Sequence, residues 1–231
     1  MVTLSDARQF LRTHGWLSAV APEFAGAILG SAKLRSFERG ETLCQAGSRH
    51  GAMVGIVRGQ VGVRWTGGSS DSEVAHIGLP GSWWGGSPLW GISRLGITRA
   101  RNDVEALQID LGDLRAIVDR VAGGWKAMGL LALDIVELLA IAHDDMMVHD
   151  IRKRCIRVLL RLSGLRPHSI LPLPPATVAL SQEELSRAAN LTRSPVSRIL
   201  HELETRGLVR LHYRSIEVVD PPGLAALAEA E

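Results

Sequence analysis

The stretch from residue 180 to residue 209 constrains this chain most, because it holds two short helical patterns around a tight turn at Ala189-Asn190. At about 100° per residue, the second helix has two different faces. Its apolar face can pack against Leu185 and Ala188 of the first helix. The pattern predicts a helix-turn-helix, a motif that inserts the N-terminal end of its second helix into the major groove of DNA. The apolar face consists of Val196, Ile199, Leu200 and Leu203, and the polar face of Arg193, Ser194, Ser197, Arg198 and His201.

The composition describes a globular protein with room for a sizeable core. The 231 residues suffice for one large or two ordinary domains, and 46% are hydrophobic against 22% charged. No apolar run approaches the ~18 residues of a membrane span, and the first residues lack a secretion signal. The two cysteines, Cys44 and Cys155, have no CxxC partners, which suits a reducing compartment rather than a disulfide, zinc or iron–sulfur scaffold. We therefore expect a cytoplasmic protein that does not bind membranes.

The charge is distributed unevenly, although the net charge of +2 says little by itself. Residues 150–214 hold twelve Lys or Arg and five Asp or Glu, whereas residues 1–149 hold fourteen and fifteen. A basic second half is typical of a segment that meets a polyanion such as DNA, but Arg-rich helices are also common as solvated surfaces. Charge alone leaves both interpretations open.

The first part of the chain carries the pattern of a β domain preceded by helices. One or two short helices are predicted over residues 5–35, with Ser5 and Asp6 as caps and Pro22 opening the second helix. Six short β-like segments then predict an antiparallel sandwich or barrel, followed by a short helix over Leu111–Val118 capped by Asp110. The segments are Glu41–Cys44, Met53–Arg58, Val61–Trp65, Glu73–Ile77, Ile97–Ala100 and Val104–Ile109, with turns at Gly47, Gly59-Gln60, Gly67-Gly68-Ser69-Ser70 and Pro80-Gly81.

A long helix is predicted from Ala122 to Val148. Its apolar residues alternate in steps of three and four, which is the pattern of a coiled-coil seam. Because further apolar residues widen this surface, we expect the β domain on one side and the same helix of a second subunit on the other. A buried helix in a monomer is the alternative. The seam consists of Met128, Leu131, Ile135, Leu138 and Ala142, widened by Leu130, Leu133, Val136 and Leu139.

The C-terminal part, after a boundary near His149-Asp150, contains the helix-turn-helix and short elements around it. An amphipathic helix over Ile151–Ser163 places Cys155 on its apolar side, where we read it as a core residue. A Pro-rich connection from Gly164 to Pro175 follows. The remaining predicted elements are a β-hairpin wing of Leu208–Leu211 and Ile216–Val219 around a turn at His212–Arg214, and a terminal helix over Leu224–Ala230 after Pro221-Pro222.

Several short sequence motifs are spread along nearly the whole chain. They are Gly40-Glu41-Thr42-Leu43 to Gly47, Gly59-Gln60-Val61, Pro80-Gly81-Ser82, Leu180-Ser181 to Leu185, Thr192-Arg193, Val196-Ser197-Arg198-Ile199-Leu200, and Leu203-Glu204 to Gly207-Leu208-Val209. Together these features resemble the Crp/Fnr family of bacterial transcription regulators. The resemblance implies an α+β fold with a cyclic-nucleotide-binding-type antiparallel β-roll at residues 1–121, a long dimerisation helix at 122–149 and a winged helix-turn-helix at 150–231. It also implies a homodimer on a pseudo-palindromic site in double-stranded DNA, with RNA polymerase as a further candidate partner.

Two arginines of the second helix, Arg193 and Arg198, are the candidates for reading bases. A planar guanidinium can bond O6 and N7 of guanine together, which is worth ~1–3 kcal/mol of discrimination, but it can instead hold a phosphate. Ser194 departs from the best-known member of the family, which has Glu at this position, so we expect a different target site. Ser197 and His201 are secondary candidates on the same face.

The turn and the wing supply further candidate DNA contacts. Ser181 is expected to cap the first helix, where hydroxyl and N–H groups can hold a phosphate, and Gln182 lies in the same helical turn. Asn190 occupies the position that needs a left-handed backbone and is usually Gly in the family. Thr192 is the predicted N-cap of the second helix. Arg214 in the wing is expected to meet the DNA backbone.

The residues expected to grip a cyclic nucleotide are mostly absent. The resemblance implies a Gly-Glu pair for the ribose and an Arg-Ser pair for the phosphate, whereas this chain has Gly85-Gly86 and Arg94-Leu95 at those places. Leu139 and Ala140 replace the hydroxyls that the long helix presents to the base. Because ligand groups left unpaired on burial are costly, we expect cyclic AMP not to be a tight ligand, and the sequence does not identify another effector.

Three tryptophans lie where the nucleotide-binding segment is expected. Trp83, Trp84 and Trp90 either line an apolar or stacking pocket for another small molecule, or fill the vacated cavity and close it. A structural rather than sensory β-roll would make the chain a constitutive or architectural DNA binder.

Metal and catalytic sites find little support in the sequence. Asp145 and His149 are four residues apart, a usable ligand spacing beside His143, but a polar hinge or interhelical pairs explain these residues as well. His76 and Glu73 are too few for a cupin-like metal enzyme, and we find no Ser-His-Asp pattern. We therefore expect no catalytic residues and no certain cofactor.

Overall fold

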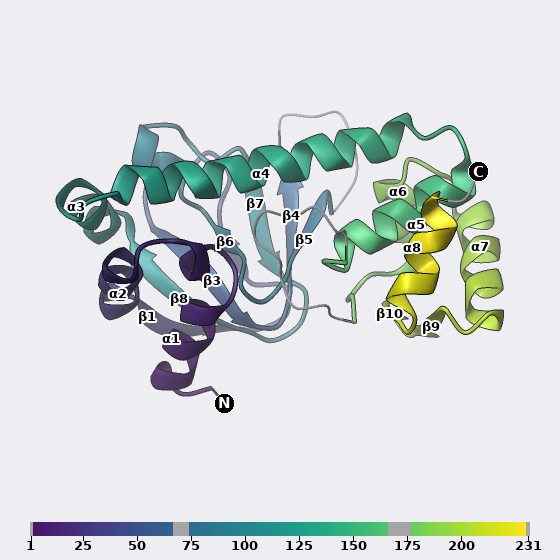
Figure 1. Ribbon diagram of the computed structural model, residues 1–231, viewed down its shortest axis with the longest axis horizontal. Helices are drawn as coiled ribbons and strands as arrows, with labels where there is room; N and C mark the ends of the chain where they lie inside the picture. Colours follow the sequence, from purple (N-terminus) through teal and green to yellow (C-terminus); the bar gives the residue numbers. More distant parts are fainter. Residues whose placement is uncertain (1, 67–73, 166–176, 230–231) are drawn as a thin grey trace.

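The computed structural model describes residues 2–66, 74–165 and 177–229 (Figure 1). A long helix, α4 (Gly124–Met147), runs along one side of the molecule. Two β-sheets and the N-terminal helices lie against its first part, and the C-terminal helices gather near its far end (Figure 1). The predicted α+β architecture of β-roll, long helix and winged helix-turn-helix is confirmed.

The N-terminal helices pack on one face of the β-roll. Thr3, and not Ser5 or Asp6, is the N-cap of the first helix: its hydroxyl oxygen accepts a hydrogen bond from Asp6 N. Asp6 returns the bond from the third helical position and completes a capping box. Pro22 opens the second α-helix as predicted, because a missing N–H is harmless there. The elements are α1 (Leu4–Thr13), η1 (Trp16–Ala19) and α2 (Pro22–Ser31).

The predicted helical region extends too far, because residues 33–37 form strand β1 (Lys33–Phe37). This strand pairs antiparallel with β8 (Val104–Asp110), where Leu34 lies opposite Leu107. The alternation of exposure along β1 is weak, so a partner some seventy residues away along the chain decides its conformation.

Within the described residues, eight strands form two four-stranded antiparallel sheets, ordered β1-β8-β3-β6 and β2-β7-β4-β5. Gly59 joins β3 to β4 at φ 83°, where a Cβ would lie 2.3 Å from the Asp103 carbonyl oxygen. Five strands match their predicted bounds to within one residue, whereas β5 starts at His76 rather than Glu73 and β6 has no predicted counterpart. The remaining bounds are β2 (Thr42–Cys44), β3 (Ala52–Arg58), β4 (Val61–Trp65), β5 (His76–Gly78), β6 (Trp83–Trp84) and β7 (Gly96–Ala100).

Some predicted features lie outside the described residues. These are Glu73, the turn at Gly67–Ser70 and all but the first residues of the Pro-rich connection from Gly164 to Pro175. Within the described residues, no helix has both the length and the apolar sequence that crossing a membrane requires.

The short helices between the sheets and α4 are η2 (Ser87–Trp90) and α3 (Leu111–Arg120). Asp110 occupies the predicted N-cap position of α3, but it makes no capping hydrogen bond. Its carboxylate instead lies 3.7 Å from Nζ of Lys33, a residue of the strand β1 that the sequence did not predict.

The start of α4 is fixed against the N-terminal helices. Trp16 is buried, and its Nε1 donates a hydrogen bond to the Ala127 carbonyl oxygen at 2.7 Å. Met128 is fully buried against the β-roll, whereas Leu133 and Val136 remain 58% and 59% exposed. One face of α4 therefore packs on its own chain, and an apolar face is uncovered in the single chain.

The C-terminal domain is a winged helix-turn-helix, as predicted. Burial raises the pKa of the Cys155 thiol to about 12, which agrees with its place in the core. Ile77 and Leu79 of the β-roll belong to the same core, so it joins the two parts of the chain. The last helix starts at Pro221 rather than Leu224, since proline fits a first helical turn. The elements are α5 (Ile151–Leu162), α6 (Gln182–Ala188), α7 (Arg193–Thr205), β9 (Val209–His212), β10 (Ser215–Val218) and α8 (Pro221–Glu229).

Candidate DNA interface and effector pocket

Helix α7 divides its residues between two faces as the sequence predicted. Its apolar residues Val196, Ile199, Leu200 and Leu203 are buried, whereas Arg193, Ser194, Arg198 and His201 are exposed and Ser197 is half-buried. The five polar residues line one shallow hollow on the surface. Within the described part of the chain, neither guanidinium on this face has a hydrogen-bond or ion-pair partner, so both are available to an external partner.

The turn before α7 has the backbone that the sequence predicted. Asn190 adopts φ 50°, in the left-handed region. Thr192 occupies the N-cap position of α7, but its side chain makes no capping hydrogen bond. Ser181 caps α6: its Oγ accepts from Glu184 N at 3.2 Å, and Glu184 Oε2 accepts from Ser181 N at 2.8 Å. This capping box fixes the first turn of α6, to which Gln182 also belongs.

A second hollow lies between the first turn of α6, the start of α7 and the wing. Ser181, Gln182 and Arg193 line it from the helices, and Tyr213 and Arg214 line it from the turn between β9 and β10. Sequence reasoning missed Tyr213, which is 92% exposed; an aromatic residue in the predicted turn was the available signal. Because Arg193 borders both hollows, the predicted contacts of helix, cap and wing form one surface.

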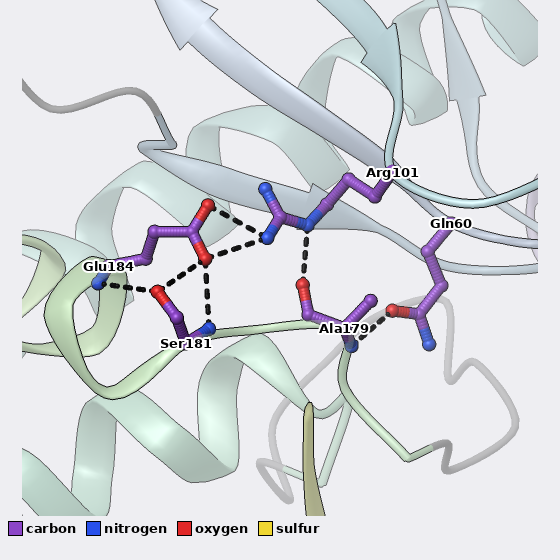
Figure 2. A network of polar contacts seen from close by, with 5 residues as sticks. All are labelled: Gln60, Arg101, Ala179, Ser181 and Glu184. Carbon is purple, nitrogen blue, oxygen red and sulfur yellow. Dashed lines mark hydrogen bonds and ion pairs between the residues drawn. The ribbon is translucent and has the colours of Figure 1, made fainter. Parts of the chain in front are cut away.

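Two side chains of the β-roll hold the segment that leads into α6 (Figure 2). Gln60 is buried; its Oε1 accepts from Ala179 N at 2.8 Å and its Nε2 donates to the Thr177 carbonyl oxygen at 2.5 Å. Arg101 Nε donates to the Ala179 carbonyl oxygen at 2.5 Å, and its Nη2 lies 2.8 and 2.9 Å from the two carboxylate oxygens of Glu184. The orientation of the helix-turn-helix is therefore tied to the β-roll at its first helix.

Glu184 is the acidic residue of this network, and it is buried. Burial by itself raises the pKa of Glu184, but hydrogen bonds from Ser181 and the charge of Arg101 outweigh burial and lower the pKa below its usual range. Glu184 is therefore ionised at neutral pH and keeps its ion pair with Arg101. Removing Arg101 would leave a buried carboxylate with too few partners, so the contact is sensitive to mutation.

The β-roll contains a cavity of about 330 Å³ on the side that faces α4. Trp83 and Trp84 are buried in its wall, and Trp90, which also lines it, is 45% exposed. The tryptophans therefore line a cavity without filling it. Its wall is predominantly apolar, and α4 contributes Met128, Leu131, Ala132, Ile135 and Leu139.

Arg94 is the charged residue among the described residues that line this cavity, and it is only 6% exposed. Its guanidinium donates to the carbonyl oxygens of Gly85 at 3.2 Å and Ala52 at 2.8 Å, and to that of His50. All three nitrogens of the guanidinium are thus bonded to backbone. Arg94 fastens separate segments of the β-roll together.

Gly85 and Gly86 bring the backbone close to neighbouring side chains at the same cavity. Gly85 has φ 94°, and a Cβ there would lie 2.7 Å from Cys44 Sγ. A Cβ at Gly86 would meet Met53 Sδ at 3.3 Å. Neither glycine offers a side-chain acceptor for a ribose hydroxyl, and packing leaves little room for one.

The acidic residues at the end of α4 pair with arginines of α5. Asp145 is fully buried, with Arg161 Nε 2.8 Å from Oδ2 and Arg157 Nε 3.3 Å from Oδ1. Arg157 also pairs with Asp144. In the described part of the chain, no three His, Cys, Asp or Glu side chains gather as metal ligands would. Interhelical pairs, one of the alternatives left by the sequence, are thus found for Asp144 and Asp145.

His76 on β5 packs beside Trp84, with ring centroids 5.6 Å apart. Its Nδ1 is covered and has no hydrogen-bond partner among the described residues. Burial, with a smaller contribution from the charge of Arg161, lowers the pKa of His76 to about 3. The imidazole is therefore neutral at neutral pH.

The fold and the free basic helix face define a winged helix-turn-helix protein with a β-roll. The family model of the Crp-like helix-turn-helix domain matches residues 153–227. This match shows that residues 153–227 form a Crp-like helix-turn-helix domain. No curated protein matches the chain.

Several solved structures share this fold. A CRP-family transcriptional regulator of Thermus thermophilus has 20% identity and a TM-score of 0.62, over 85% of this chain and 97% of that chain. FixK2 of Bradyrhizobium japonicum has 17% identity and a TM-score of 0.61, over 87% and 98%. A CooA mutant of Carboxydothermus hydrogenoformans has 17% identity and a TM-score of 0.61, over 90% and 93%.

Proposed function

We propose that this chain forms a cytoplasmic homodimer that binds a pseudo-palindromic DNA site and responds to an effector other than cyclic AMP. The observation that carries the proposal is the polar face of α7, where Arg193 and Arg198 are exposed and without partners among the described residues. A helix with such a face fits the major groove, where a guanidinium reads guanine through two hydrogen bonds.

The other candidate contacts take roles that follow from their positions. Ser194 offers a short hydroxyl where a longer acidic side chain would accept from cytosine, so we expect no strong cytosine preference from this position. Ser181, Gln182 and Arg214 border the hollow between α6 and the wing, a position suited to phosphates. Ser197, His201 and Thr192 are assigned secondary contacts on α7.

The uncovered face of α4 supports the homodimer. Leu133, Val136 and Leu139 follow one another at helical spacing and are 58%, 59% and 47% exposed. A two-fold partner with the same stripe buries these residues on both chains. Two recognition helices held in this way meet half-sites about one helical turn of DNA apart, on the order of 34 Å.

The β-roll cavity argues against cyclic AMP. A cyclic nucleotide brings a phosphate and a ribose hydroxyl, yet the guanidinium of Arg94 is bonded to three backbone carbonyls and Gly86 has no side chain. Burying those ligand groups without partners is unfavourable. Calorimetric titration is expected to show no binding of cyclic AMP; a dissociation constant of about 1 μM or tighter would contradict this part of the proposal.

Selection of bound DNA from a random pool tests the proposed function. We expect enrichment of two inverted half-sites whose centres are about 10–10.5 base pairs apart, bound by two chains. Sedimentation of the complex measures the number of chains. Enrichment of a single half-site, or no enrichment above the starting pool, would contradict the proposal.

A constitutive DNA binder is the second candidate function. The observation that favours it is Arg94, because its guanidinium, at the cavity wall, is bonded to the backbone of the β-roll itself. Footprinting on the selected site, with and without a cell extract of small metabolites, separates the two. A footprint that changes with the extract supports a sensor, and an identical footprint supports the constitutive binder.

A further inference from the structure

A second cavity, of about 400 Å³, lies between the β-roll and the DNA-binding domain, close to the network in Figure 2. It is distinct from the apolar cavity beside α4, with which it shares no lining residue. Glu184 of α6 and Arg214 of the wing line it from the C-terminal side. The β-roll side contributes Arg39, Arg64, Arg99 and Arg101, so five guanidinium groups and one carboxylate surround this space.

The strand register explains why arginines gather here. In the pairing of β4 with β7, Gly62 lies opposite Arg99 and Arg64 lies opposite Ile97. Residues two apart on a strand share a face, so Arg64 and Arg99 project from the same face of the sheet. Gly62 has no side chain to occupy the space beside them, and a Cβ there would already be in van der Waals contact with Val74 Cγ2 at 3.4 Å and Arg101 Cδ at 3.5 Å.

The described residues leave most of the charge of this cavity uncompensated. Glu184 neutralises Arg101, whose Nη2 lies 2.8 Å from Glu184 Oε1. In the described part of the chain, the side chains of Arg39, Arg64, Arg99 and Arg214 make no hydrogen bond or ion pair. Elsewhere the chain pairs arginines with acids, as Arg115 with Asp119. Like charges around one hollow repel each other unless an anion joins them.

We propose that this cavity binds a small, multiply charged phosphate anion, such as the polyphosphate group of a metabolite. Guanidinium groups match phosphate oxygens with paired, charge-assisted hydrogen bonds. The volume lies in the range of small-molecule sites. A DNA backbone presents single charges in a row along a surface, whereas these arginines surround one hollow between two domains, which favours a compact anion.

The position of the site couples it to the arrangement of the domains. Arg64 and Arg99 belong to the β-roll and Arg214 belongs to the wing, so an anion that contacts both sides bridges them. A ligand that binds only one arrangement stabilises it by mass action. The anion therefore strengthens the docked arrangement in which Arg101 contacts Glu184. The site itself does not depend on DNA recognition, so it can be tested without DNA.

Calorimetric titration of the full chain with inorganic tripolyphosphate at about 0.15 M salt tests the proposal, since surface attraction is screened there. We expect saturable binding of one anion per chain, weakened at least tenfold in the double variant Arg64→Gln/Arg99→Gln. Arg214→Asn, which keeps a residue tolerant of φ 57°, is expected to weaken it as well. The matched control is Arg12→Gln/Arg35→Gln, which removes two exposed charges that do not line the cavity and is expected to bind as the unmodified chain does.

Three outcomes would overturn the proposal. The first is no saturable binding to the unmodified chain, and the second is equal loss in the Arg64/Arg99 and control variants, which indicates unspecific attraction. The third is unchanged anion binding in Arg64→Gln/Arg99→Gln, together with weaker salt dependence of DNA binding. If the slope of the logarithm of the DNA-binding constant against the logarithm of salt concentration fell by about 0.9 per replaced arginine, these arginines would be contacts to the DNA backbone. Circular dichroism confirms that each variant is folded. A failure of DNA selection, in contrast, would not affect the anion titration.

Discussion

The recognition helix and the β-roll cavity each carry an arginine that the sequence marked as a ligand contact, and the structure treats the two differently. Arg198 on α7 is exposed, with no side-chain partner among the described residues. Arg94 is 6% exposed and bonded to three backbone carbonyls. An arginine side chain is therefore available to an external partner on α7, whereas in the β-roll it is fully hydrogen-bonded within the protein. What an arginine does is decided by the acceptors that its own fold already supplies.

This difference separates the two halves of the molecule. The DNA-binding half presents its chemistry to an external partner, with buried residues serving only to hold α7 in place. In the β-roll half, Arg94, at the position expected to bind a phosphate, is hydrogen-bonded to backbone carbonyls of the same domain. The cavity beside it is predominantly apolar. The resemblance to the Crp/Fnr family predicts both regions equally, but only the first retains the expected chemistry.

Replacing each of the two arginines with alanine is expected to give the largest difference between the two regions. Arg94→Ala leaves three carbonyl oxygens without their donor inside the β-roll, so we expect a loss of about 3–5 kcal/mol in the free energy of unfolding. Arg198→Ala removes an exposed side chain and is expected to change it by less than about 0.5 kcal/mol. Urea unfolding of both variants measures the difference. Equal losses would show that Arg94 is not structural.

The uncovered face of α4 gives the next largest effect. Leu133→Glu/Val136→Glu places charges on the proposed dimer stripe and is expected to give monomers that remain folded. Because two half-sites are then bound separately, apparent DNA affinity is expected to fall at least 100-fold, about 2.7 kcal/mol. Sedimentation and fluorescence anisotropy measure the two effects. Gln9→Glu/Ser31→Glu, which adds two charges at exposed positions of α1 and α2, is the control, and an intact dimer in the Leu133/Val136 variant would contradict the assignment.

The contact between the regions is expected to have an intermediate effect. Arg101→Gln leaves the buried carboxylate of Glu184 poorly paired, and we expect it to cost about 1–3 kcal/mol of stability. Adding Glu184→Gln removes the unpaired charge and is expected to recover part of the loss. A double-mutant cycle by denaturant unfolding gives the coupling energy. Strictly additive losses would mean that the pair does not couple the β-roll to α6.

The effect that is smallest near neutral pH concerns His76, on the buried side of the β-roll. The pKa of His76 is lowered from 6.5 to about 3, so the unfolded chain binds a proton that the folded chain does not. Titration of this group does not lower the free energy of unfolding above pH 6.5. The free energy of unfolding falls as the pH drops from 6.5 towards 3, by at most about 1.4 kcal/mol per pH unit. His76→Phe is expected to flatten the decline between pH 6.5 and 5. An unchanged slope would show that His76 is not the responsible group.

Local periodicity explains why α7 was predictable from the sequence. Its two faces follow from helical spacing alone, and Val196 and Arg198 lie on the sides that this spacing assigns. The left-handed Asn190 was likewise a local property, because few residues other than glycine tolerate it. Bounds of most strands followed from glycines and turn residues in the same way.

Long-range contacts explain what the sequence could not supply. The acceptors of Arg94 are backbone oxygens, two of them more than forty residues away, and carbonyls carry no sequence signal. Arg101 meets Glu184 across 83 residues, and β1 owes its conformation to β8. In each case a distant partner selected the local outcome. The tryptophans were ambiguous for the same reason, since lining and filling a cavity differ only in the packing around them.

The most direct test of the central claim is selection of DNA by Arg198→Ala beside the unmodified chain. The free guanidinium on α7 is expected to read one base pair in each half-site, so the variant should lose about 1–3 kcal/mol of discrimination there and keep its preferences elsewhere. A uniform loss of affinity over all sequences, with every base preference retained, would contradict the claim and make Arg198 a phosphate contact.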